Sequence, residues 1–208
     1  MSCRRLLIKN YYTKEMRTMR HKLKSKNNLL ILLTFLLALP IVSTDIYLPS
    51  IHEISKFFNT SHQKVQLTLT LYFLTFGFIQ LVYGSLSDCF GRKPMMITSL
   101  LIYIFGTSIC IYSDTITLLI IGRFLQALGA GSAILVFAIV RDMYEGSKVA
   151  RIIAYMSAVV AISPIIAPIF GGYVQSLLSW RWNFIPIFTI FTYKSLIFWH
   201  TASTIHLI

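Results

Sequence analysis

The chain has 208 residues, of which 56% are apolar and only 12% are charged, and its mean hydropathy is +0.70. This composition excludes an ordinary soluble domain and indicates a protein that lies in a lipid bilayer. The formal charge of +12 does not indicate a nucleic-acid partner, because nine of the nineteen lysine and arginine residues precede residue 27, ahead of the first apolar segment.

Apolar segments long enough to cross a bilayer follow one another along the chain. A helix needs about 20 residues to cover about 30 Å of hydrocarbon. Five segments meet this requirement, at approximately 29–49, 65–85, 94–112, 116–140 and 152–178. A sixth, 182–208, is apolar and aromatic but contains Pro186, a central Lys194, His200 and His206, and a lysine near the middle of a span is unusual.

The sequence therefore predicts an all-α integral membrane protein with five clear helices and a less regular sixth. We divide it into a basic arm at 1–28, a five-helix membrane core at 29–182 and a sixth segment at 183–208.

The basic residues predict the orientation. Fourteen lie in the N-terminal arm and the second and fourth loops, against three in the alternate loops, Lys56, Lys64 and Arg181. Since loops rich in lysine and arginine stay in the cytoplasm, we expect the N terminus and both of those loops to be cytoplasmic.

Enzyme chemistry has little support in the sequence. Cys3, Cys89 and Cys110 have neither metal-ligand spacing nor a disulfide pattern, and the five histidines are scattered. No nucleophile and base constellation or phosphate-binding loop is present in the sequence. We therefore expect no enzyme, no metal and no cofactor.

A charged segment bracketed by glycines separates the second and third predicted helices. It reads Gly84-Ser-Leu-Ser-Asp88-Cys-Phe-Gly91-Arg92-Lys93. Glycines, an aspartate and two basic residues in this order, between two spans, resemble the signature loop of the major facilitator superfamily. In that family the loop latches the two halves of the transporter together in one state, so the resemblance implies a cytoplasmic gate that includes Lys93.

Physical chemistry offers a role for each residue of this segment. Gly84 and Gly91 permit tight turns and close helix approach, and Asp88 can cap a helix start. Arg92 can pair with a carboxylate, and Asp142 at the end of the fourth span is expected on the same side. The alternative is that these charges only mark the membrane boundary.

A second motif lies in the fourth predicted span. Residues 123–131, Arg123-Phe-Leu-Gln126-Ala-Leu-Gly-Ala-Gly, resemble the buried-arginine motif of the same family, with Ala127 where a glycine is usual. An arginine inside a span needs a partner. Asp45 is four residues from Pro49 and Arg123 is six from Thr117, which predicts similar depths of about 6 and 9 Å below the outer surface.

We therefore expect Asp45, Arg123 and Gln126 to couple protons to substrate. An arginine neighbour favours the ionised form of Asp45 and apolar burial favours the neutral form, so this carboxyl group is the candidate proton carrier. The alternatives are that Asp45 reaches outward to lipid headgroups and that Arg123 extends its side chain to the interface.

The fifth predicted span is rich in small residues and prolines. This pattern weakens the backbone hydrogen bonding of a helix and allows another helix to approach. It resembles the antiporter motif of the family, with serine and alanine in place of its first two glycines; the alternative is an ordinary kinked helix. The residues concerned are Ser163, Pro164, Ala167, Pro168, Gly171 and Gly172.

Two further runs resemble one branch of the family. Asp45-Ile-Tyr-Leu-Pro49 and Gln80-Leu-Val-Tyr-Gly84 are similar to the bicyclomycin-resistance branch of drug/proton antiporters. The resemblance, which covers residues 29 to about 182, implies efflux of drugs or small metabolites across a bacterial inner membrane, driven by the proton gradient. Aromatic residues that could line a drug path, or simply pack, are Tyr47, Tyr72, Phe73 and Phe76.

The length of the chain departs from this family. Members have two six-helix halves, and 208 residues supply only the first. The resemblance fades after Trp182, which is the pattern of a tail altered by truncation or frameshift. Three readings stay open: a transporter half that needs a second copy or a complementary chain, an inactive remnant, and a membrane enzyme or channel subunit.

Overall fold

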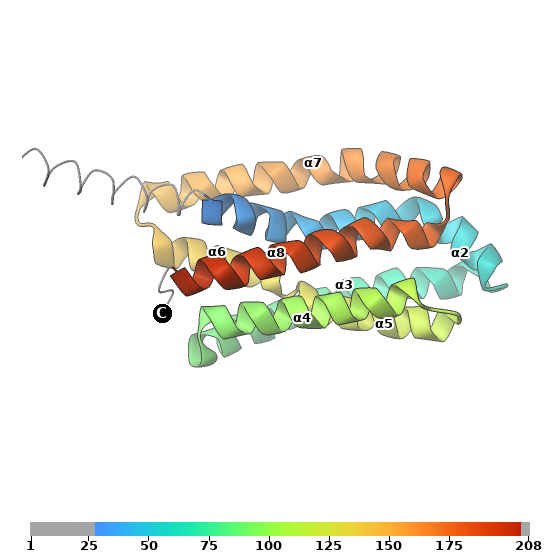
Figure 1. Cartoon of the computed structure of the whole chain (residues 1–208), viewed down its shortest axis with the longest axis horizontal. Helices are drawn as coiled ribbons and strands as arrows, with labels where there is room; N and C mark the ends of the chain where they lie inside the picture. Colours follow the sequence, from blue (N-terminus) through green and yellow to red (C-terminus); the bar gives the residue numbers. More distant parts are fainter. Residues whose placement is uncertain (1–27, 205–208) are drawn as a thin grey trace, which may run out of the picture.

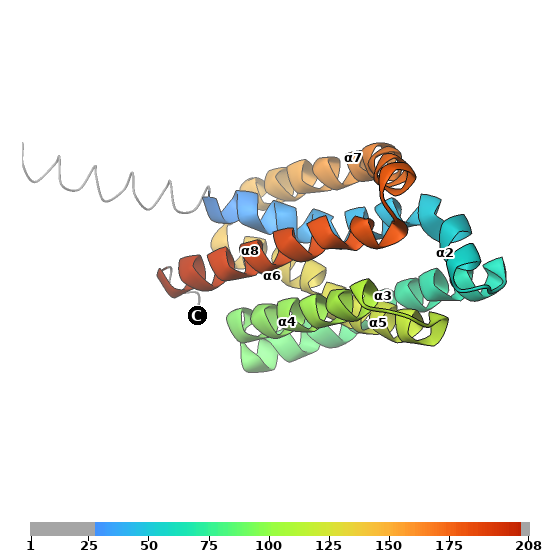
Figure 2. The same cartoon turned by 45° about the vertical axis from the view of Figure 1, so that its right-hand side comes forward.

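The computed structural model describes residues 28–204, with side chains described for residues 28–198. The predicted basic arm, apart from residue 28, and the chain end with His206 lie outside the described residues. The described part is a bundle of long helices. In both views α7 forms one edge of this bundle and α4 lies at the opposite edge, with the N-terminal helix and α8 between them (Figures 1 and 2).

The bundle contains five helical stretches that are long and apolar enough to cross a membrane. The first, Asn28–Phe57, comprises the N-terminal helix at residues 28–47, the short 3₁₀ helix η1 (Leu48–Ser50) and α2 (Ile51–Phe57). The others are α3 (His62–Phe90), α4 (Arg92–Ile111), the pair α5 (Ile116–Ala130) and α6 (Ser132–Met143), and α7 (Ser147–Leu177). The chain continues through the 3₁₀ helix η2 (Trp180–Asn183) into α8 (Phe184–Thr204).

Successive connections alternate between the two ends of the bundle (Figure 1). We call the end that holds Gly91 and residues 144–146 the motif end, and the end that holds residues 58–61, 112–115 and 178–179 the far end. Basic residues near the motif end are Arg92, Lys93, Arg141, Lys148 and Arg151, whereas those near the far end are Lys56, Lys64 and Arg181. By the positive-inside rule, the motif end is the predicted cytoplasmic end.

The loop predicted at residues 84–93 is much shorter in the structure, so this prediction is wrong. α3 continues through this segment to Phe90, and α4 begins at Arg92, so only Gly91 lies outside a helix. Gly91 has a φ of 91°, which a glycine adopts without steric cost. The prediction erred because the length needed to cross a bilayer describes only the apolar part of a helix. α3 has 29 residues and is about 43 Å long.

Two residue roles within this segment change as a consequence. Gly84 lies inside α3, where an added Cβ would meet no described atom within 4 Å, so it provides neither a turn nor a close approach within this chain. Asp88 lies in the last turn of α3 and does not cap a helix start.

The first helical stretch also extends beyond its predicted end. Pro49 lies at the start of η1, a position where proline is tolerated because its missing N–H has no helical partner there. The stretch then continues to Phe57. Asp45 is therefore twelve residues, or about 18 Å, from the C-terminal end of this stretch, whereas it is only four residues from Pro49, the predicted end.

The sixth predicted segment forms the helix α8, which packs on α4. The ring of Phe191 in α8 stacks on that of Tyr103 in α4, with the ring centroids 3.8 Å apart. Lys194 lies on the same helix with its Nζ 4.5 Å from the ring centroid of Phe35 in the N-terminal helix. An aromatic face is a favourable neighbour for an ammonium group away from water.

Candidate functional site

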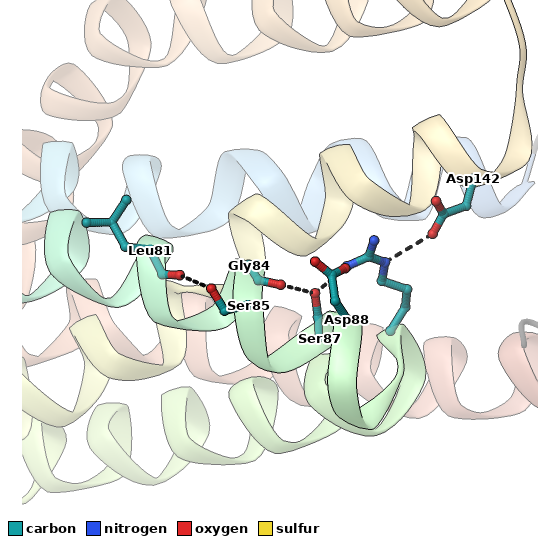
Figure 3. Close-up of polar contacts among 7 residues, drawn as sticks. Leu81, Gly84, Ser85, Ser87, Asp88 and Asp142 are labelled. Carbon is teal, nitrogen blue, oxygen red and sulfur yellow. Dashed lines mark hydrogen bonds and ion pairs between the residues drawn. The ribbon is translucent and has the colours of Figure 1, made fainter.

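A cluster of charged side chains joins three helices at the motif end. Arg92, the first residue of α4, places Nη1 2.7 Å from Oδ1 of Asp88 in α3 and donates from Nε to Oδ2 of Asp142 in α6 at 3.0 Å. Nη1 also donates to Oγ of Ser87. Figure 3 shows Asp142 reaching toward the end of α3, where Ser87 and Asp88 lie.

The geometry of this cluster follows from Gly91. Because a single residue separates α3 from α4, Arg92 lies four positions after Asp88 and beside the end of α6. The side chain of Arg92 is 22% exposed, and those of Asp142 and Asp88 are 53% and 66% exposed. Exposed pairs contribute about 0–1 kcal/mol each to stability, so this cluster suits reversible contacts better than permanent anchoring.

The side chain of Arg123 is enclosed in the middle of the bundle by the rings of Tyr47, Tyr72 and Phe184, which we call the Arg123 box. The residue is fully buried, and its Nη1 donates to Oε1 of Gln126 at 2.8 Å. Its Cζ lies 3.9 Å from the ring centroid of Tyr47, 5.2 Å from that of Phe184 and 5.4 Å from that of Tyr72. Nε and Nη2 have no hydrogen-bond partner among the described residues. Aromatic faces therefore replace a counter-ion around this guanidinium group.

Gln126 links Arg123 to two further helices. Its Nε2 donates to Oγ1 of Thr107 in α4 at 2.9 Å and to Oγ of Ser43 in the N-terminal helix at 3.5 Å. All of these residues are buried. Arg123 and Gln126 thus form one polar network across the bundle core.

The predicted pairing of Asp45 with Arg123 is wrong. Asp45 forms no ion pair among the described residues and instead accepts a hydrogen bond from Oγ of Ser163 in α7 at 3.0 Å. The reason is the helical phase: Tyr47, which faces Arg123, is two residues after Asp45, and two residues turn a helix by about 200°. Asp45 and Tyr47 therefore point to opposite sides of the N-terminal helix.

Asp45 lies at the wall of a small cavity of about 40 Å³. The cavity is otherwise lined mainly by apolar and aromatic side chains, including Tyr72, Phe73 and Phe76 of α3. Asp45 is partly exposed, so its carboxylate is accessible from outside the packed core. Among the predicted drug-path aromatics, Tyr72 is shared between this cavity and the Arg123 box, whereas Tyr47 belongs to the box alone.

The small residues of α7 form one narrow buried stripe. Apart from Met156, the buried residues of this helix are Ser163, Ala167 and Gly171, spaced by four. A Cβ at Gly171 would overlap the carbonyl oxygen of Ile46, so this glycine allows two backbones to touch. A Cβ at Gly172 would only reach ordinary contact with Pro49 at 3.9 Å.

Pro164 and Pro168 lie inside α7, which runs through both without interruption. Each proline lacks the N–H that would bond to the carbonyl four residues earlier, so the helix has two missing backbone hydrogen bonds within one turn. The structure places both prolines next to the buried stripe.

Several partners in these sites were not found from the sequence. Ser43, Thr107 and Phe184 complete the Arg123 network, and Asn183 donates from Nδ2 to Oγ of Ser50 at 2.9 Å. The one available signal was spacing, because Ser43 and Tyr47 lie four residues apart and so share a helix face. Nothing local in the sequence identifies Phe184, which comes from a distant helix.

Comparison with known proteins places the fold and the family. A model of the Major Facilitator Superfamily matches residues 30–199, so the similarity continues beyond residue 182, where the sequence resemblance was expected to fade. Multidrug resistance protein D of Escherichia coli is 30% identical over 155 residues, which is 74% of this chain and 39% of that protein. A bicyclomycin resistance protein homolog of Haemophilus influenzae is 30% identical over 161 residues, 76% of this chain and 40% of that protein.

A solved structure of a peptide transporter in complex with sulfate shares the fold. It has a TM-score of 0.73 at 17% identity and covers 83% of this chain and 37% of that transporter. The chain thus spans about 40% of the length of the curated relatives that it matches. The five membrane-length helices, the family match and these bacterial relatives agree: the chain is a multi-pass membrane protein that belongs to the Major Facilitator Superfamily.

Proposed function

We propose that this chain supplies the first half of a proton-driven antiporter that exports drugs or small metabolites across a bacterial inner membrane, with its N terminus in the cytoplasm. The observation that carries the proposal is Asp45, a carboxylate inside the first membrane-length helix that borders a cavity and has no basic partner among the described residues. Ionisable groups inside membrane spans commonly mark ion or proton pathways.

The surroundings of Asp45 support proton exchange. Apolar and aromatic neighbours disfavour a carboxylate, so a proton or a cationic substrate at this position would relieve an unfavourable charge. The single polar contact from Ser163 leaves the other carboxylate oxygen available. One group can therefore bind either a proton or a cation, which is the minimum requirement for exchange. Arg123 and Gln126 have a different role in this proposal: they hold the helices that frame the cavity.

The charged cluster at the motif end is proposed as one side of a cytoplasmic gate. Asp88 is 66% exposed and forms one ion pair among the described residues, to Arg92, so its carboxylate can accept a further donor from another chain or half. The exposed apolar side chains of α3, among them Leu74, Phe78 and Leu81, support the same architecture, because they leave a surface on which a second half can pack.

The test is transport by membranes that contain the chain. A pH gradient is imposed across the membrane of everted vesicles, and uptake of the lipophilic cation ethidium is followed by fluorescence. We expect Asp45→Asn to abolish gradient-driven uptake because the amide cannot exchange a proton. The matched control is Asp114→Asn, since Asp114 is 88% exposed at the far end and pairs with Arg181. Equal uptake with Asp45→Asn and the unchanged chain would contradict the proposal.

A second candidate is that the chain does not transport by itself and acts only with a partner, either a second copy or a complementary half. The supporting observation is poor burial of two helices: only 22% of the most apolar window of α3 and 17% of that of α7 is buried, compared with 44% for α4. If transport appears only when a complementary half is supplied, this candidate holds. If neither arrangement transports ethidium or any other tested cation, the chain is an inactive remnant.

A further inference from the structure

One hydrogen bond joins the membrane-embedded carboxylate to α7. Oγ of Ser163 donates to Oδ2 of Asp45 at 3.0 Å, and Ser163 is only 7% exposed. Ser163 also lines an apolar groove of about 560 Å³ that lies between the N-terminal helix, α7 and α8. The bond therefore crosses from one helix to the next at the edge of an otherwise apolar space.

On the far-end side of this bond, α7 is held by close packing. Gly171 lies against the backbone of Ile46, and Ala167 is buried in the same stripe. The amide of Asn183 donates to the carbonyl oxygen of Gly171 at 3.4 Å and so ties this part of α7 to η2. These contacts involve backbone atoms and do not depend on charge.

On the motif-end side of the bond, the attachment of α7 is weaker. The next buried residue in that direction is Met156, about two turns away. Pro164 follows Ser163 directly, and Pro168 lies one turn further, so the backbone ladder is weakest between the two parts of the helix. A helix with this pattern can bend at the prolines while its far-end part stays in place.

The strength of the bond depends on the charge of Asp45. A hydrogen bond to an ionised acceptor is roughly twice as strong as one between neutral groups, so protonation of the carboxyl group weakens the tie from Ser163. Among the described residues, the other titratable group at this cavity is Tyr72 of α3, and the nearest charge behind it is Arg123 of α5, whose Cζ lies 5.4 Å from the Tyr72 ring centroid. Ser163 is the polar contact that α7 makes with Asp45.

We propose that Ser163 is a positioning residue through which the charge of Asp45 controls α7. When Asp45 is ionised, Ser163 holds the motif-end part of α7, residues 147–162, against the N-terminal helix. When Asp45 takes up a proton, this part is released and bends at Pro164 and Pro168. The inference rests on the proposed function only in that Asp45 is the group that takes up the proton.

The experiment measures hydrogen exchange of the full chain in lipid nanodiscs, by mass spectrometry of peptides within residues 147–162. We expect Asp45→Asn and Ser163→Ala each to raise exchange in this segment by about tenfold, the effect of losing one hydrogen bond to a charged group. The double variant should exchange no faster than Ser163→Ala alone, because Asp45→Asn weakens the same bond that Ser163→Ala removes. Peptides from α4 should be unchanged.

Two further variants separate positioning from packing. Ser163→Thr keeps the hydroxyl and should restore slow exchange, whereas Ser163→Cys keeps the size with a weak donor and should behave like Ser163→Ala. Ser157→Ala is the matched control on the same helix, because Ser157 is exposed. In the unchanged chain, acidification should accelerate exchange of the segment after correction for the intrinsic rate, and Ser163→Ala should remove this response.

Additive effects of Asp45→Asn and Ser163→Ala, or a pH response that persists in Ser163→Ala, would overturn the inference. The outcome is independent of transport. If the exchange pattern is as expected but no ethidium is transported, Ser163 couples to Asp45 and the antiport proposal fails. If Asp45→Asn abolishes transport while exchange in the segment is unchanged, the antiport proposal holds and the role of Ser163 is refuted.

Discussion

At the scale of single residues, Arg123 combines a buried charge with an incomplete set of partners. Within the described part of the chain its one side-chain hydrogen bond is to Gln126, and three aromatic rings surround the rest of the guanidinium group. A lysine would not replace it, because an ammonium group has no flat face to stack on these rings while it donates sideways to Gln126. The arginine in this motif therefore organises the core of the half.

Gln126→Leu tests this network. The substitution leaves Nη1 of Arg123 without its acceptor and Oγ1 of Thr107 without its donor, inside a fully buried site. We expect the free energy of unfolding to fall by about 1–3 kcal/mol or more, the cost of a buried unsatisfied group. The measurement is unfolding by sodium dodecyl sulfate in mixed micelles, followed by circular dichroism.

Two variants calibrate this result. Ser43→Ala removes only the longest bond of the network, at 3.5 Å, and should cost less. Gln63→Leu changes an exposed glutamine near the start of α3 and should stay within about 0.5 kcal/mol of the unchanged chain. A loss for Gln126→Leu no larger than that for Gln63→Leu would show that the guanidinium group does not depend on Gln126.

At the scale of helices, glycines decide which backbones touch. α4 and α5 pack so closely that a Cβ at Gly106 would overlap the backbone of Gln126, and one at Gly129 would overlap the backbone of Tyr103. Gly171 does the same for α7 and the N-terminal helix. The sequence indicated such a role for Gly171 through its motif, but Gly106 has no motif around it and was not identified.

Gly129→Ala should destabilise the half through this helix pair. The added methyl group meets backbone atoms that cannot rotate away, and overpacking of this kind costs about 1–3 kcal/mol. Gly77→Ala is the matched control, because a Cβ there meets no described atom within 4 Å and alanine is the better helix former. It should be neutral or stabilising by up to about 1 kcal/mol. Equal losses for both variants in the same unfolding assay would contradict the close packing.

At the scale of the whole molecule, the unburied surface is unevenly distributed. Leu74, Phe78 and Leu81 form one exposed stripe along α3, spaced as neighbours on a helix face. α7 is also poorly buried, whereas the first stretch and the pair α5 and α6 have 61% and 67% of their most apolar windows buried. Such a difference is expected if α3 and α7 face a second half or a second copy, as in the proposed architecture.

Cysteine cross-linking tests which face meets a partner. Phe78→Cys is introduced on α3 in a chain whose Cys3 and Cys89 are replaced by serine; the buried Cys110 is kept. We expect this cysteine to form a disulfide-linked dimer in membranes, and a co-expressed complementary half to suppress the dimer by covering the same stripe. Phe105→Cys on α4, at a residue that is 62% exposed, is the control and should not cross-link. Equal cross-linking from both positions would mean that neither face is a specific interface.

The sequence predicted much of this architecture. The helix content, the five membrane-length helices and the family are confirmed. The contact between Arg92 and Asp142 is also present, since both lie at helix ends on the same side of the bundle. The boundaries were less accurate, because polar turns such as Ser85 to Asp88 continue a helix beyond the hydrocarbon. The pairing of Asp45 with Arg123 failed because similar depth does not determine the direction of a side chain.

The sequence by itself determined that the chain lies in a lipid bilayer, where its helices are, and which loops carry the basic residues. Hydropathy and loop charge can be read from each segment separately. Only the tertiary structure decided which side chains meet. Asp45 binds Ser163 and Arg123 is surrounded by aromatic rings because each residue turns a helix by about 100°, so a contact between helices depends on the rotation of both. That rotation is a property of the packed bundle, and no single segment contains it.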